Sequence, residues 1–190
     1  MSKPINKKFI TELRESLETI TRANDFYQIW WYLIQLINNK LGPVRSGDTK
    51  PWAYEAVAEA CLISMTVSIS RLFDKRKDSM SIAKILKEAQ RDSVITPNEF
   101  KELDSKLRHL SPTAEKVKVL RSNLHAHRVR FRTVEDIYTE ARITPNQFRD
   151  LISGVFTVLN ELANKLGSMD WSLKSAALEG FKEMVGGEHI

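Results

Sequence analysis

The sequence predicts an all-α helical bundle with long N-terminal helices, because apolar residues recur at helical spacing, turn-forming residues are scarce and several helix starts carry capping residues. In the first segment Phe9, Leu13, Leu17 and Ile20 follow one another at steps of three or four residues, which places them on one helical face. The chain has only seven glycines and six prolines, whereas a protein of many short strands needs such residues at each tight turn. An all-β sandwich or barrel is therefore not expected.

Length and composition predict one folding unit. The chain has 190 residues, of which 42% are hydrophobic, and domains commonly contain roughly 100 to 200 residues. We therefore expect residues 1–190 to form a single helical domain. Its most informative motifs lie within residues 26–132 and its C-terminal helices within 145–186.

The first half of the chain predicts three helices. The apolar stripe that begins at Phe9 predicts a long helix over residues 5–39, which ends before Gly42-Pro43. A second helix is expected from Trp52 to about Asp74, with Pro51 suited to its first turn. A short third helix carries Ile82, Ile85 and Leu86, and the residues that could cap it are Asp78, Ser79 and Ser81.

Cap chemistry predicts the later helix starts. Thr96-Pro97-Asn98-Glu99 and Thr144-Pro145-Asn146-Gln147 each place a hydroxyl residue before proline and an acid or amide three residues later, which is the pattern of a capping box. Ser111-Pro112 predicts a further start by the same reasoning. The helix that begins at Pro145 should end before Gly167, and a last helix is expected from near Asp170 to Gly186-Gly187.

The composition also indicates the cellular compartment in which the protein is expected. Cys61 is the single cysteine, so an intramolecular disulfide and a cysteine-rich zinc site are both excluded, and a reducing compartment is expected. The longest mainly apolar stretch, residues 26–37, is interrupted by Gln28 and Gln35 and is too short for a membrane span of about 20 residues. No signal peptide is recognisable, so we expect a cytoplasmic protein without a membrane partner.

One segment concentrates basic residues. The chain carries a formal net charge of +5, and residues 120–132, Leu-Arg-Ser-Asn-Leu-His-Ala-His-Arg-Val-Arg-Phe-Arg, contain no acidic residue. Arg128, Arg130 and Arg132 suit RNA phosphates, and Phe131 could stack on a base. A solvated basic helix end, favoured by the helix dipole, is the alternative interpretation.

The same segment contains residues suited to proton transfer. A histidine can both accept and give a proton near neutral pH, and an arginine can hold a phosphoryl oxygen, so the two suffice for metal-free cleavage of RNA. Arg121, His125 and His127 are the candidates. No metal site is expected, because alternate positions on a helix point apart and no acidic residue is nearby in sequence. Phosphate-binding loops, nucleophile elbows and His-Glu-x-x-His pairs are absent from the sequence.

Two motifs resemble the HEPN superfamily, whose signature is an arginine, four to six intervening residues and a histidine near a helix end. Arg121 and His127 match this pattern with five residues between them, and Leu120-Arg121-Ser-Asn-Leu-His-Ala126-His127-Arg128 looks like the AbiU branch. Upstream, Trp52-Ala-Tyr-Glu and Ser68-Ile-Ser-Arg71-Leu-Phe-Asp74 are similar to that branch in order and spacing. The resemblance covers roughly residues 26–132.

The resemblance implies a fold, an activity and partners. It implies a helical bundle that forms a homodimer, in which Arg121 and His127 of both subunits line one cleft and act as a metal-independent endoribonuclease without a cofactor. RNA is the implied substrate. Members often serve in abortive infection or as toxins, which implies an antitoxin as a further partner.

Five further residues are expected to support this site. Arg71 and Asp74 are three residues apart, so they either pair with each other or orient the cleft residues. Ser122 departs from the family, where asparagine, aspartate or histidine often follows the arginine, and Asn123 lies one residue later. His125 is the rival base, because it is nearly in line with Arg121 on an ideal helix, whereas family spacing favours His127.

A second function remains open at this point. A non-catalytic HEPN-like interaction protein would keep the fold and bind a partner or nucleic acid, and Ser122 favours this alternative. The intact pair of Arg121 and His127 favours the enzyme. A DNA-binding regulator is the weakest alternative, because no helix presents base-reading residues in a clear row.

Overall fold

The computed structural model describes residues 6–38, 49–76, 79, 81–126, 141–167 and 171–185. Within these ranges the chain forms helices and no strand, which confirms the predicted all-α class. The helices are α1 (Lys7–Leu36), α2 (Thr49–Leu72), α3 (Ile82–Arg91), α4 (Pro97–Ala126), α6 (Pro145–Lys165) and α7 (Ala176–Met184).

The first three helices lie where the sequence places them. The side chain of Asn6 caps α1 by accepting a hydrogen bond from the Lys8 amide at 3.0 Å, and the stripe that begins at Phe9 is buried. Ser81 is the N-cap residue of α3, although its hydroxyl makes no capping hydrogen bond. The hydroxyl of Ser79 instead donates to the carbonyl oxygens of Asp74 and Arg76.

Both predicted capping boxes are present. At α4 the Thr96 amide donates to the Glu99 carboxylate at 2.7 Å, and the Glu99 amide donates to the Thr96 hydroxyl at 3.3 Å. At α6 the Thr144 amide donates to the Gln147 side chain at 3.1 Å, and the Gln147 amide donates to the Thr144 hydroxyl at 3.3 Å. These local contacts satisfy amides that the first helical turn leaves unpaired.

The prediction of a helix start at Ser111-Pro112 is wrong. Helix α4 runs without interruption from Pro97 to Ala126 and contains Pro112 in its interior. The Ser111 hydroxyl bonds the Leu107 carbonyl one turn earlier, at 3.2 Å, and so does not cap a new helix. Leu107 before the proline and Val117 after it are both buried, so burial of one continuous face outweighs the hydrogen bond that proline removes.

The last helix begins later than predicted. Helix α7 starts at Ala176, where the Ser175 hydroxyl accepts a hydrogen bond from the Leu178 amide at 3.2 Å. Asp170 and Gly186-Gly187 lie outside the described residues. Before α7, residues 171–175 form no regular secondary structure, and the Leu173 carbonyl accepts a hydrogen bond at 2.7 Å from the buried side chain of Asn24 on α1. A long-range contact therefore holds a segment that was expected to be the start of this helix.

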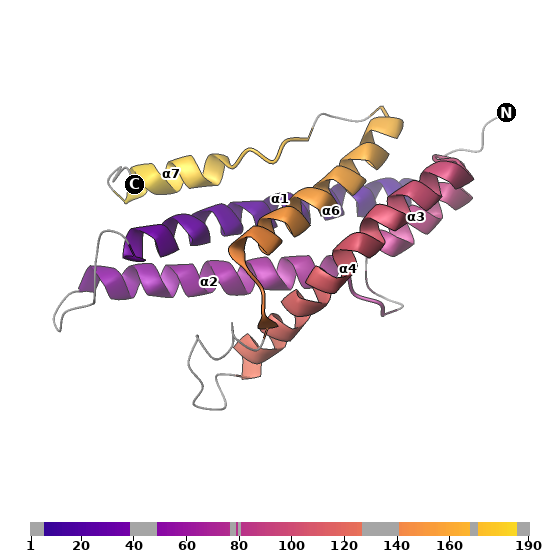
Figure 1. Cartoon of the computed structure of the whole chain (residues 1–190). Helices are drawn as coiled ribbons and strands as arrows, with labels where there is room; N and C mark the ends of the chain where they lie inside the picture. Colours follow the sequence, from indigo (N-terminus) through magenta and orange to yellow (C-terminus); the bar gives the residue numbers. More distant parts are fainter. Residues whose placement is uncertain are drawn as a thin grey trace.

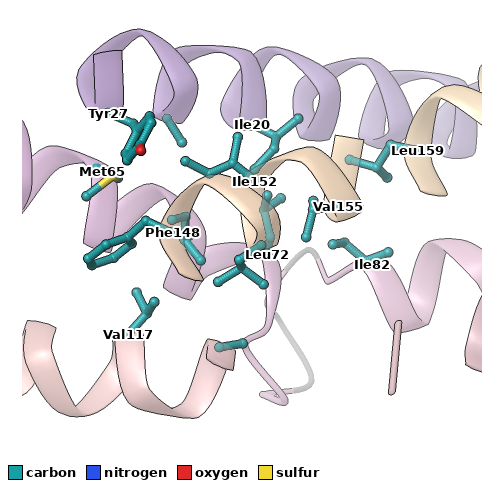
Figure 2. Close-up of a cluster of buried hydrophobic side chains, with 14 of the residues drawn as sticks. Ile20, Tyr27, Met65, Leu72, Ile82, Val117, Phe148, Ile152, Val155 and Leu159 are labelled. Carbon is teal, nitrogen blue, oxygen red and sulfur yellow. The ribbon is translucent and has the colours of Figure 1, made fainter. Parts of the chain in front are cut away.

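Helices α1 and α2 run side by side in opposite directions, α6 packs against α1 and α4, and α7 lies along α1 (Figure 1). In the interior, Phe148, Ile152, Val155 and Leu159 of α6 project among side chains of the other helices (Figure 2). All four are at most 1% exposed. These side chains belong to one buried cluster to which several helices contribute, and α2 packs directly against α4.

The aromatic run Trp30-Trp31-Tyr32 contributes mainly to the core. Trp30 is buried and packs edge-on against Phe148, with ring centroids 5.9 Å apart. Tyr32 is buried against Phe181 of α7, with centroids 6.3 Å apart. Trp31 is only partly buried. The two buried rings connect α1 to α6 and α7.

Candidate functional site

A polar cleft lies between the C-terminal end of α2 and the C-terminal half of α4. Its volume is about 550 Å³, and its described lining residues are Ser70, Asp74, Lys75, Arg76, Glu115, Lys118 and Arg121. Four of these side chains are cationic and two are anionic, so the cleft carries a positive charge that suits an anionic ligand. Because α2 packs directly on α4, residues far apart in sequence share this cleft.

Asp74 organises the α2 side of the cleft. It lies just beyond the end of α2, and its carboxylate accepts hydrogen bonds from the Arg76 amide at 3.0 Å and from the Arg76 Nε at 2.8 Å. The Arg76 side-chain hydrogen bond is the main cause that lowers the pKa of Asp74, followed by the backbone bond, and the Arg121 charge adds to the same effect. Asp74 is therefore an anion at neutral pH and lies within the field of Arg121.

Glu115 and Lys118 form the α4 side of the cleft. The Lys118 Nζ lies 2.8 Å from a Glu115 carboxylate oxygen, and the Lys75 Nζ lies 4.0 Å from the same oxygen. The hydrogen bond from Lys118 lowers the pKa of Glu115. The Lys118 side chain is 25% exposed and the Lys75 side chain 88% exposed, so Lys118 is the more enclosed of the two cations.

Arg121 and Ser70 retain unused hydrogen-bonding capacity. Buried Leu120 and Leu124 set the rotation of α4, and half-buried Arg121 lines the cleft without a hydrogen bond or ion pair to the residues that the structure describes. Ser70 is 2% exposed, and its hydroxyl has no hydrogen-bond partner among the described residues. A buried hydroxyl without a partner is costly, so the cleft offers both a guanidinium and a hydroxyl to a ligand.

The structure brings together some of the predicted site residues. Asp74 and Arg121 line the cleft, whereas Arg71 is exposed on α2 and is not among its lining residues. No ion pair between Arg71 and Asp74 is present, because the Asp74 carboxylate binds Arg76. Ser122 is exposed next to Arg121, and half-buried Asn123 leaves its side-chain nitrogen without a partner among the described residues.

The remaining predicted residues follow Arg121 in sequence. The backbone of His125 belongs to the last turn of α4, but its side chain lies outside what the structure describes. His127, Arg128, Arg130 and Arg132 also lie outside the described residues. Their roles remain predictions.

Five lining residues were missed by sequence analysis, namely Ser70, Lys75, Arg76, Glu115 and Lys118. Lys118 and Arg121 are three residues apart, a spacing that places both side chains on one helical face. This spacing could have identified Lys118. The other four residues depend on the packing of α2 against α4 and carry no comparable local signal.

The described part of the chain contains neither a metal-binding cluster nor a membrane-spanning helix. No group of three or more histidine, cysteine, aspartate or glutamate residues is placed to hold a metal ion there. None of the helices in the same ranges is long and apolar enough to cross a membrane.

Comparison with known proteins identifies the family. The model of the AbiU2 family, a HEPN family, matches residues 7–179, which include both sides of the cleft. Neither curated proteins nor solved structures gave a match. Because the match spans most of the chain, the protein belongs to the AbiU2 family of HEPN proteins.

Proposed function

We propose that this protein is a metal-independent endoribonuclease of the HEPN type, with Arg121 and His127 as its catalytic residues. The observation that carries the proposal is the position of Arg121. Its guanidinium lies in a cationic cleft, close enough to Asp74 for their charges to interact, and makes no hydrogen bond or ion pair with the described residues. Membership of the AbiU2 family supports the assignment, since HEPN proteins are often ribonucleases.

The chemistry requires no metal ion or cofactor. The ribose 2′-hydroxyl attacks the adjacent phosphorus, the bond to the 5′-oxygen of the next nucleotide breaks, and the products are a 2′,3′-cyclic phosphate and a free 5′-hydroxyl. His127 transfers the protons, and Arg121 stabilises the charge that develops on the phosphoryl oxygens. His125 is the alternative proton-transfer residue.

The supporting residues act on Arg121 and on the substrate. Asp74 orients the cationic side chains of the cleft, and Arg71 at the end of α2 is available to the RNA because it is exposed. Ser122 and Asn123 follow Arg121 directly on α4. Arg128, Arg130 and Arg132 bind phosphates outside the scissile bond.

The proposal includes an oligomeric state and a biological role. The chain has one set of Arg121 and His127, so a homodimer with two-fold symmetry would bring two sets to one composite cleft. A role as an abortive-infection effector or toxin in the cytoplasm, restrained by an antitoxin, follows from the family. Light scattering of the purified protein should give a dimer, and an active monomer of about 22 kDa would contradict this part.

A second candidate is a non-catalytic member that binds RNA or a partner through the same cleft. The observation that favours it is Ser122, an exposed residue in the position after Arg121. Such a protein would use the cationic cleft for binding alone.

The test is incubation of purified protein with mixed single-stranded RNA in the presence of EDTA. Cleavage that yields 2′,3′-cyclic phosphate ends supports the enzyme, and Arg121→Ala should reduce it by about 10²- to 10³-fold, as expected when a group that stabilises developing charge is removed. Binding without cleavage, across many RNAs and pH values, favours the second candidate. Ser122→Asn should then be examined for a gain of cleavage.

A further inference from the structure

The cleft extends beyond Arg121 along α4. Lys118 precedes Arg121 by three residues, so the two side chains are neighbours on the helix surface with Cβ atoms about 5–6 Å apart. Both line the same cleft. A single strand carries one phosphate per nucleotide, so one strand could place successive phosphates at the two neighbouring cations.

The second position has features that point to an anionic ligand. Ser70 is 2% exposed and lines the cleft, and its hydroxyl has no hydrogen-bond partner among the described residues. A hydroxyl can donate to a phosphate oxygen. The Lys118 side chain is only 25% exposed, so it is held at the cleft wall more firmly than a free surface lysine would be.

The counter-ion of Lys118 is displaceable. Glu115 binds Lys118 at 2.8 Å, but its own side chain is 57% exposed and a rotamer change would carry it into water. An ion pair whose carboxylate is largely in contact with water contributes little free energy. A phosphate, with more acceptor oxygens, can therefore compete with the Glu115 carboxylate for the ammonium group.

We propose that the cleft binds two successive phosphates of one RNA strand, the first at Arg121 and the second at Lys118 and Ser70, and that Glu115 competes with the second phosphate for Lys118. This inference rests on the proposed function for the identity of the ligand. It adds a subsite that the family signature does not contain, and it gives Glu115 an inhibitory role.

The test uses a single-stranded 2′-O-methyl RNA, which cannot be cleaved because its 2′-oxygen is blocked. Fluorescence anisotropy gives the affinity of the full-length protein for this probe at several salt concentrations. Lys118→Gln should lower the slope of log affinity against log salt by about 0.7, the contribution of one phosphate contact in a single strand. Ser70→Ala should weaken binding several-fold at every salt concentration, since its hydroxyl is uncharged.

Glu115→Gln provides the sharper test. It should raise affinity about three- to tenfold at low salt, because Lys118 loses its competing carboxylate. In a Lys118→Gln background the same change should have a much smaller effect, limited to the weaker contact of Glu115 with Lys75 at 4.0 Å, because a double-mutant cycle shows a large coupling for residues in direct contact.

Matched controls lie on the same helix. Glu102→Gln removes a carboxylate that pairs with Lys106 at 3.0 Å, and Lys101→Gln removes an exposed lysine about 25 Å from Lys118 along the helix axis. Neither control should alter the salt slope. Thermal unfolding of every variant verifies that the fold is retained.

The inference is wrong if Lys118→Gln binds the probe like the wild type, if Glu115→Gln and Glu102→Gln have equal effects, or if the wild type does not bind the probe. Failure of the proposed function has a different signature. A protein that shows the coupling of Glu115 and Lys118 but cuts no unmodified RNA has the subsite without the nuclease. A protein that cuts RNA with no effect of Lys118 has the nuclease without the subsite.

Discussion

The Asp74 carboxylate holds Arg76 at three points, through its amide at 3.0 Å, its Nε at 2.8 Å and its Nη2 at 2.7 Å. This arrangement closes the end of α2 and places a fixed anion near Arg121 of α4, since the charge of Arg121 acts on Asp74. The two residues come from different helices, and their proximity defines the cleft. Asp74 is therefore a positioning residue in the proposed mechanism.

Asp74→Asn tests this role. The substitution keeps the shape of the side chain but removes its charge, so Arg76 is released and Arg121 loses a nearby anion. We expect kcat for RNA cleavage to fall about tenfold, with KM unchanged or lower, because misplacement of a catalytic group affects the transition state most.

Asp104→Asn is the matched control, since Asp104 pairs with Arg108 on the exposed side of α4 at 2.7 Å. It should leave both kinetic constants unchanged. If the two variants lose stability equally and kcat is unaffected in both, Asp74 has only a structural role.

The two histidines after Arg121 have different predicted roles. His127→Ala removes the proton-transfer group and should lower the cleavage rate by about 10²- to 10⁴-fold, whereas His125→Ala should have a milder effect. Single-turnover cleavage of a labelled RNA measures both variants. The opposite ranking would mean that position along the ideal helix identifies the base better than the family spacing does.

The arginines that follow the histidines are predicted to bind RNA phosphates. Replacing Arg130 and Arg132 together with Gln should lower the slope of log affinity against log salt by about 1.4, since each single-strand phosphate contact contributes about 0.7. The control replaces Arg14 and Arg22 of α1, which are exposed, with Gln. It removes the same charge at positions distant in sequence from Arg130 and Arg132. Equal slopes for the two double variants would show that residues 128–132 are merely solvated.

Glu99, a residue of the α4 capping box, should make the stability of the fold depend on pH in the acid range. The hydrogen bond from Lys165 is the main cause that lowers the pKa of Glu99 to about 2, and the bonds from Thr96 add to it. Because the pKa of Glu99 is lower in the folded state than its ordinary value of 4.5, the ionised carboxylate stabilises the folded protein above about pH 4.5. This contribution disappears as the pH falls from about 4.5 to about 2.

Glu99→Gln should therefore flatten the loss of stability across this pH range, as measured by urea unfolding at several pH values. Glu102→Gln, three residues further along α4, is the control and should keep the slope of the wild type. An unchanged slope in Glu99→Gln would contradict the assignment.

Pro112 is exposed in the interior of α4 and offers a stability test. Pro112→Ala restores an amide donor to the helix, and in an ideal helix this raises the free energy of unfolding by about 3 kcal/mol. The unfolded chain also gains conformational freedom, which lowers the free energy of unfolding by about 0.4–1 kcal/mol. We expect the free energy of unfolding in urea to rise by about 1–3 kcal/mol. A decrease would mean that the packing of α4 requires the backbone geometry that proline imposes.

The sequence by itself determined the helical class and those helix starts that depend on neighbouring residues. Thr96 with Glu99, and Thr144 with Gln147, make their hydrogen bonds within one turn, so local chemistry was sufficient. The stripe that begins at Phe9 likewise predicted its own burial. The motif around Arg121 also indicated the family that the comparison confirmed.

Tertiary structure decided the continuity of α4 and the composition of the cleft. Ser111-Pro112 has the local chemistry of a helix start, but burial of Leu107 and Val117 on one face keeps the helix continuous. Asp74 and Arg121 are distant in sequence and share a cleft only because α2 packs against α4. Hydrogen bonds within a turn can be predicted from adjacent residues, whereas the proximity of side chains on two helices depends on the burial of the whole apolar core.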